Sequence, residues 1–213
     1  MDRRIAGHAL STQGVNFLGL VPRPSDNSFV HKFIVGLVLV LFAFAVAPAG
    51  ADQRDPRLEK LFTQLKAATT MEESQPVEAK IWEIWMESGD QNVDALMAIG
   101  TSALNDEDYG QAYRAFGRVV QLAPNFAEGW NKRATALYLL GRFDDSMKDI
   151  AKTLALEPRH FGALSGLGLC NAQLDKEKEA LDAFEKALAI NPNMPGIRQD
   201  AEDLKKSLAA KSI

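Results

Sequence analysis

Apolar positions recur every three or four residues along most of the chain from residue 56 onwards, which is the spacing of amphipathic α-helices. Three prolines, Pro124, Pro158 and Pro192, interrupt this pattern at two equal intervals of 34 residues. Each proline follows a helical segment with a similar ending, VVQLAP, TLALEP or ALAINP. Because proline cannot continue a helix, each one marks a helix end. The pattern predicts tandem helix-turn-helix units over residues 93–126, 127–160 and 161–194.

These units resemble the tetratricopeptide repeat, a 34-residue helix-turn-helix with large, small and proline residues at fixed offsets. Large residues fill the gaps between helices at Leu96, Trp130, Phe116 and Phe184, and small ones allow close approach at Gly100, Ala112, Gly168 and Ala180. The middle unit departs from the pattern, with Arg133 at a normally apolar position and with Ser146 and Thr153 in place of alanine. In the third unit, Asn171 stands where an aromatic residue is common.

The resemblance implies an all-α fold in which the units stack into a right-handed superhelix, because each unit alone leaves an apolar face uncovered. Residues 52–92 hold two further helical patterns, which we interpret as a degenerate leading helix pair. Residues 195–213 hold a helix that opens at Pro195 and has one polar side, as expected for a C-terminal capping helix.

An uninterrupted apolar run over residues 33–46 precedes the repeats. A basic flank at Lys32 and small residues at Ala49 and Ala51 complete the pattern of a signal peptide, with cleavage before Asp52. We therefore expect residues 1–51 to be a leader and the mature protein to be periplasmic.

Two alternatives concern this leader. The apolar run is shorter than the roughly 20 residues that span a bilayer, so no membrane insertion is expected after cleavage. An uncleaved signal that anchors the protein to the membrane is the alternative. Initiation at Val30 is an alternative start, since it would leave residues 1–29 untranslated and give the signal a short basic flank.

Few residues in the repeats could support catalysis. Of three histidines and one cysteine, only His160 and Cys170 follow the predicted cleavage site. We expect His160 to be an ordinary loop residue and Cys170 a buried structural thiol, because neither has a partner for a metal cage or a nucleophile-base pair. The formal net charge of −4 gives no reason to expect a nucleic-acid partner. We predict no catalytic residue, no metal, no cofactor and a non-enzymatic role.

By resemblance to the family, the first helix of each unit lines a concave groove that binds a protein or peptide. The candidate partner-contacting residues are Met97, Thr101, Leu104, Asn105, Asn131, Lys132, Thr135, Tyr138, Leu139, Ser165, Leu169 and Gln173. The family also has a clamp of Lys, Asn and Arg for a peptide's terminal carboxylate. Lys132 is the only cation at the groove positions, so we do not expect that clamp here.

The tryptophans Trp82 and Trp85 fall on a helix that is apolar nearly all round, so we expect them in the core rather than in a docking patch. The leading hypothesis for function is an exported adaptor, assembly factor or chaperone-like module that binds a partner in the groove. The alternative is a structural envelope protein that self-associates through its terminal helices or through Trp82 and Trp85. The sequence leaves the oligomeric state open.

Overall fold

A computed structural model describes residues 55–211 of the chain. Internal contacts divide the chain into two units, Met1–Val46 and Ala47–Ile213, and all the described residues belong to the second. The expected leader with its apolar run and cleavage site therefore lies outside the described residues.

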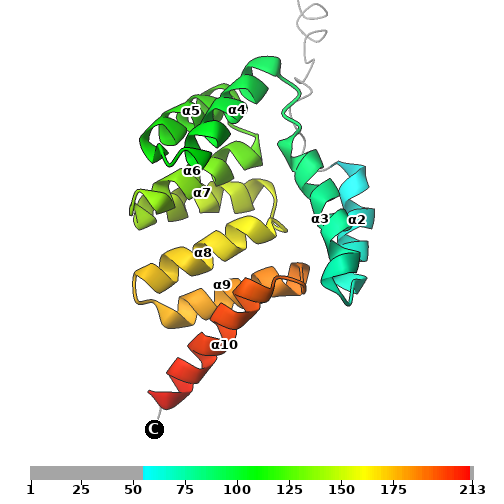
Figure 1. The fold of residues 1–213 in the computed structure, drawn as a ribbon, viewed down its shortest axis with the longest axis vertical. Coiled ribbons are helices and arrows are strands. Elements are labelled where there is room, and N and C mark those ends of the chain that lie inside the picture. The colour runs from blue at the N-terminus through cyan, green and yellow to red at the C-terminus, as the bar shows by residue number, and fades with distance from the viewer. Residues whose placement is uncertain (1–54, 212–213) are drawn as a thin grey trace, which may run out of the picture. The chain divides into compact units, whose positions relative to one another are not determined.

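The described part of the chain is all-α, and its helices follow one another in antiparallel pairs (Figure 1). This confirms the expected fold class. The nine helices within these residues are α2 (Pro56–Ala67), α3 (Met71–Met86), α4 (Gln91–Asn105), α5 (Tyr109–Leu122), α6 (Ala127–Leu139), α7 (Phe143–Leu156), α8 (Phe161–Gln173), α9 (Glu177–Ile190) and α10 (Pro195–Ala210).

The 34-residue period reappears in the helix boundaries. Helices α5, α7 and α9 begin 34 residues apart, as do α6 and α8. The residues that end the second helices are Ala123, Glu157 and Asn191, with φ angles of −127°, −133° and −120°. These extended angles follow from the next residue, because proline disfavours the α conformation of the residue before it.

Close approach within a unit depends on a small residue in its first helix. An added Cβ on Gly100 would lie 2.5 Å from the Phe116 ring, and one on Gly168 would overlap the Phe184 ring. The middle unit has Ala134 and Ile150 at the corresponding positions, and both are buried. Where the second helix carries an aromatic ring, the facing position on the first helix is glycine. Where the second helix carries a smaller aliphatic residue, the facing position is alanine.

A Gly168→Ala variant should therefore lower the free energy of unfolding by about 2 kcal/mol, since the added methyl group overpacks the Phe184 ring. Urea denaturation followed by circular dichroism measures the change. The double variant Gly168→Ala/Phe184→Ile copies the middle unit and should recover part of the loss. A fully stable single variant would show that the ring moves aside without cost.

The polar residues in the middle unit are bonded inside the stack. Arg133 forms a two-point ion pair with Asp149, at 2.6 and 2.7 Å. The Ser146 hydroxyl donates to the carbonyl of Ala134 at 2.8 Å, and the Thr153 hydroxyl donates to the carbonyl of Asp149 at 3.1 Å. These side chains therefore find their hydrogen-bond partners within the repeat, so none of these departures from the family pattern leaves its polar side chain without a partner in the packed interior.

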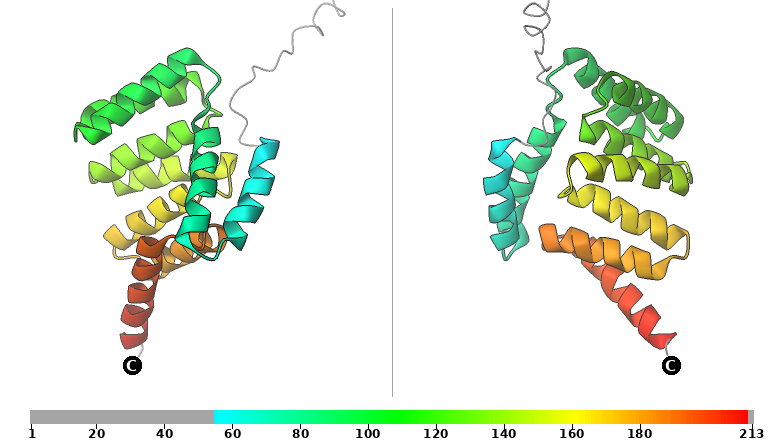
Figure 2. Two further views of the ribbon diagram at one scale, coloured as in Figure 1. Left: turned by 45° about the vertical axis from the view of Figure 1, so that its right-hand side comes forward. Right: turned by 180° about the vertical axis from the view of Figure 1, so that it is seen from behind.

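The first helix pair departs from a regular stack. Helices α2 and α3 pack on each other and turn back beside the repeats, where they contact α6 and α9, and Figure 2 shows this from two further sides. Their apolar residues share a cluster with Phe161, Ile190 and Met194 from α8, α9 and the segment that follows α9. Aromatic packing thus places α3 at the edge of the stack. At the other end, α10 packs on α9 around Ala201 and Phe184.

Candidate partner groove

The twelve candidate groove residues divide into three groups by exposure. Three residues one period apart are buried, namely Met97, Asn131 and Ser165. Half-buried residues form a second group, namely Thr101, Leu104, Lys132, Tyr138 and Leu169. The exposed ones are Asn105, Thr135, Leu139 and Gln173. Only the second and third groups present surface that a partner could contact, and whether one does so stays a prediction.

Several half-buried candidates already take part in internal packing. Tyr138 lies 5.4 Å from the ring of Phe143, measured between centroids, and belongs to the α6–α7–α8 cluster. Leu169 packs against the cluster that α9 and α10 share. A charged substitution at either position would disturb the fold as well as the groove, so exposed positions are better suited to testing partner contact.

Helix α3 covers part of the groove that the repeats would otherwise leave open. The Lys132 ammonium lies 5.8 Å from the ring centroid of Trp82. A Cβ added to Gly162 would come 2.7 Å from Cη2 of the same ring. The absence of a side chain at Gly162 therefore lets the indole approach the start of α8 closely. The side chain of Trp82 thus lies beside the candidate groove residue Lys132 of α6 and the first turn of α8.

Trp85 fixes α3 in this position and is fully buried. Its ring stacks on that of His160, with centroids 4.1 Å apart and planes 9° from parallel. Phe62 and Phe161 also pack against it, at 6.0 and 5.2 Å between centroids. The prediction that Trp85 is a core residue is confirmed, which removes it from any exposed self-association surface. Trp82 is half-buried.

His160 is a buried structural residue, so the expectation of an ordinary loop residue is wrong. Its Nδ1 accepts from the backbone N–H of Ala163 at 3.0 Å and so caps α8. Nδ1 can accept only in the tautomer that carries the proton on Nε2, and Nε2 lies 2.9 Å from Oε2 of Glu128. The histidine therefore joins the start of α8 to α6 while supporting the Trp85 ring.

Glu128 lies under this aromatic layer and is fully buried. Its Oε2 also accepts from the amide of Asn131 at 3.1 Å, and Lys132 approaches its Oε1 at 3.4 Å. Lys132, the cation among the candidate groove residues, thus forms an ion pair with an internal carboxylate.

Polar contacts anchor the α2–α3 pair along the edge of the stack. The Arg159 guanidinium binds Glu59 of α2 at 2.6 Å. The Asn191 amide donates to Glu78 of α3 at 2.9 Å, and the amide of Asn193 donates to the carbonyl of Ala68 at 2.9 Å. These contacts lie near both ends of the α2–α3 pair, and together they fix its orientation along the stack.

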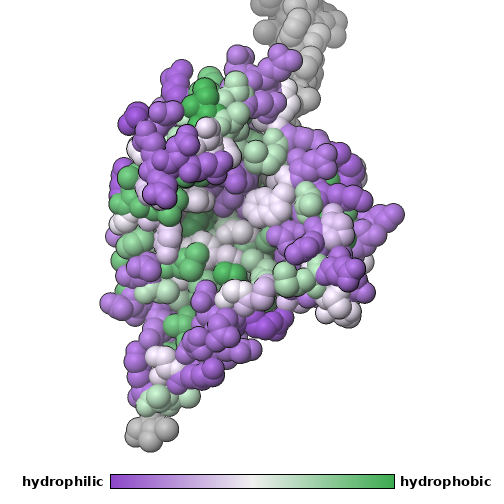
Figure 3. Space-filling view, viewed as in Figure 1, coloured by the Kyte–Doolittle hydropathy of each residue, from purple (hydrophilic) through white to green (hydrophobic). Residues whose placement is uncertain are grey.

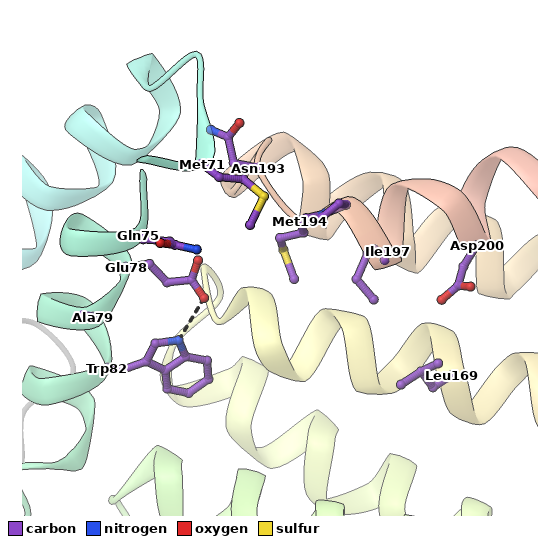
Figure 4. A pocket seen from close by; sticks show the side chains of 12 residues that line it. Met71, Gln75, Glu78, Ala79, Trp82, Leu169, Asn193, Met194, Ile197 and Asp200 are labelled. Carbon is purple, nitrogen blue, oxygen red and sulfur yellow. Dashed lines mark hydrogen bonds between the residues drawn. The ribbon is translucent and has the colours of Figure 1, made fainter. Parts of the chain in front are cut away.

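A cavity of about 620 Å³ remains between α3, α8 and α10. In Figure 4, the side chains of Trp82, Leu169, Met194 and Ile197 point toward this space from different elements. Figure 3 shows a hollow between the repeats and the α2–α3 pair, with pale and green surfaces inside and purple surfaces around it. Helix α3 thus forms one wall of an open, largely apolar pocket beside the candidate groove residue Leu169.

The titratable groups near the repeat core have structural roles. Hydrogen bonds from Arg133 to Asp149 raise the pKa of the guanidinium above its already high ordinary value. Burial raises the pKa of the Cys170 thiol, which donates to the Ser146 hydroxyl at 3.4 Å. Cys170 is buried, as expected for a structural thiol. Within residues 55–211, no group of three or more His, Cys, Asp or Glu side chains is placed to hold a metal ion.

In the same described segment, none of the helices is both long enough and apolar enough to cross a membrane.

Comparisons with known proteins agree with this geometry. Tetratricopeptide repeat models match residues 97–153 and residues 162–194. A TPR repeat-containing protein of Rhizobium etli is 34% identical over 136 residues, which are 64% of this chain and 67% of that protein. The small glutamine-rich tetratricopeptide repeat-containing protein 2 of Mycosarcoma maydis is 31% identical over 117 residues, which are 55% of this chain and 31% of that protein. The chain thus spans about two thirds of the first relative and about a third of the second.

Solved structures share the fold at lower identity. The Sgt2 TPR domain of Aspergillus fumigatus aligns with a TM-score of 0.55 and 22% identity, over 58% of this chain and 83% of that domain. The first TPR of Spaghetti (RPAP3), bound to an HSP90 peptide, aligns with a TM-score of 0.54 and 23% identity, over 56% of this chain and 94% of that one. Taken with the sequence matches over the repeats, these similarities show that the chain belongs to the tetratricopeptide repeat family.

Proposed function

We propose that this protein is a non-enzymatic interaction module of the cell envelope that binds a partner protein or peptide in its concave groove. The observation that carries the proposal is the open pocket between α3, α8 and α10, which is lined mainly by apolar residues and includes Leu169 of the candidate groove. Proteins of the same fold support the mode of binding. RPAP3 was solved with an HSP90 peptide, and the type III secretion chaperone SycD of Yersinia enterocolitica was solved with a peptide of the translocator YopD.

The envelope location rests on the signal-peptide pattern of residues 33–51 and on no other observation. In that compartment the module would act as an adaptor, an assembly factor or a chaperone-like holder of another protein. N-terminal sequencing of the protein from fractionated cells tests this part. A mature chain that begins at Asp52 in the periplasmic fraction is the expected result, and a cytoplasmic chain that retains Asp2–Asn27 would contradict it.

Site-specific photo-crosslinking tests the groove. A photoreactive residue is placed in separate variants at Asn105, Leu139 or Gln173, which are exposed and one period apart. The matched controls carry it at Arg118, Lys152 or Lys186, also exposed and one period apart, on the second helices. We expect the groove set to capture one and the same partner and the control set to leave it uncaptured, because the first helices line the concave face.

Equal capture by both sets, or capture by the control set alone, would refute groove binding. All six positions are exposed, so the variants should keep the wild-type circular dichroism spectrum and melting temperature, which serves as the folding control.

A further inference from the structure

The pocket between α3 and α10 differs from an ordinary repeat groove because helix α3, which precedes the repeats, forms one of its walls. Met71 and Trp82 come from α3, Leu169 from α8, and Ile197 from α10, with Met194 just before α10 (Figure 4). We refer to these five residues with Glu78 and Asp200 as the α3–α10 pocket. A volume of about 620 Å³ is suited to a few apolar side chains rather than to a whole domain.

The charged residues at this pocket are carboxylates. Glu78 accepts from the indole N–H of Trp82 at 3.2 Å and from the Asn191 amide at 2.9 Å. Both donors are neutral, so they orient the carboxylate without cancelling its charge. Asp200 is exposed on α10. No Lys, Arg or His is among the described residues that line the pocket, and the nearby Lys132 is paired with Glu128.

Among the described residues, the charged residues that line this apolar pocket are carboxylates, and this combination favours one kind of occupant. We propose that the α3–α10 pocket binds the apolar side chains of a basic peptide segment, in which Lys or Arg residues adjoin leucine-like residues. This rests on the proposed groove-binding function and names the partner class. The flexible side chains of Met71 and Met194 can adapt to different apolar residues. A basic segment brings its charges near Glu78 and Asp200, whereas an acidic segment would be repelled.

The test uses the full-length chain and two fluorescent 14-residue probe peptides. One contains only Leu and Lys in amphipathic helical order, and the other has Glu at every Lys position. Fluorescence anisotropy at low salt measures both dissociation constants. We expect the Lys peptide to bind about tenfold more tightly or better, and we expect added salt to reduce this preference.

Two variants locate the binding. Met71 is 45% exposed and Asp200 is also exposed, so neither change should affect folding. Met71→Ala should weaken the Lys peptide about fivefold, and Asp200→Asn about threefold. The matched controls are Met86→Ala, near the other end of α3 and 37% exposed, and Asp106→Asn, beside the α4–α5 turn. Each should change the affinity less than about twofold.

Several outcomes would overturn the proposal. Two are equal affinity for the two peptides and control variants that weaken binding as much as the pocket variants. A third comes from a photoreactive residue placed at position 71: crosslinks to a second copy, or to the chain's own apolar run at residues 33–46, instead of to the Lys peptide would also contradict it. The groove crosslinks from Asn105, Leu139 and Gln173 are measured separately. If they capture a partner while the peptide test fails, the proposed function stands and only the partner class is wrong.

Discussion

An Arg133→Leu variant should lose about 3 kcal/mol of unfolding free energy, because it leaves the Asp149 carboxylate buried without its counterion. The Asp149 side chain is only 6% exposed, and both of its oxygens accept from Arg133. Urea denaturation followed by circular dichroism measures the loss. Asp149→Ala should cost less, because the Arg133 side chain is 20% exposed and packs over Trp130, from where its charge can reach water.

The third repeat supplies the control for this pair. Leu167 and Ala183 lie one period after Arg133 and Asp149. The double variant Arg133→Leu/Asp149→Ala copies them, and it should return to within about 1 kcal/mol of the wild type, since an apolar pair can replace a buried ion pair. A double variant as unstable as Arg133→Leu alone would mean that the leucine, rather than the orphaned carboxylate, causes the loss.

The same comparison shows what the repeat period can predict. Arg133 stands out in the sequence as a departure from an apolar position. The counterion of Arg133 can be recognised only when its position and that of Asp149 are compared together in all three units. The equivalent pairs are Ile99 with Ala115, Arg133 with Asp149, and Leu167 with Ala183. The period thus places helix ends and close contacts well, because each unit repeats the same local packing. Comparison of equivalent positions also reveals an ion pair when two positions that are apolar in the other units carry opposite charges in one unit.

His160 was predictable in the same way, although its residue type argued against burial. It lies one period after Phe126, which is buried, and one period before Met194. The position is therefore a core position of the repeat. A buried histidine there needs hydrogen-bond partners, and these are the local N–H of Ala163 and the carboxylate of Glu128 on α6. Its stacking on Trp85 links segments 75 residues apart, and no local pattern indicates it.

The turn-back of the α2–α3 pair could not be predicted from local patterns. The sequence predicts both helices, but the direction of the pair depends on a short connection, in which Gly89 has a φ of +75°. It also depends on contacts with α6, α8 and α9 that lie far along the chain. Hydrophobic periodicity shows that the apolar surface of α3 must be buried, but it does not identify the helices that bury it. The wall that α3 contributes to the α3–α10 pocket is thus a property of the tertiary structure alone.

A Trp85→Ala variant should have the largest effect on this wall, lowering the free energy of unfolding by about 4 kcal/mol. The side chain is fully buried and packs against His160, Phe62 and Phe161, so truncation removes the centre of the cluster that holds α3. Urea denaturation measures the loss. Limited proteolysis near Gly89 reports whether the α2–α3 pair leaves the stack before the repeats unfold.

Trp85→Phe is the matched control and should cost about 1 kcal/mol, since an aromatic ring still stacks on His160. Within residues 55–211, no acceptor pairs with the Trp85 indole N–H, so its removal breaks no hydrogen bond. In Trp85→Ala, release of α3 should also remove the preference for the Lys peptide, because Met71, Glu78 and Trp82 leave the α3–α10 pocket together. If the variant keeps both its protease resistance and that preference, the anchors of Glu59, Glu78 and Ala68 hold the wall without Trp85, and its assigned role is wrong.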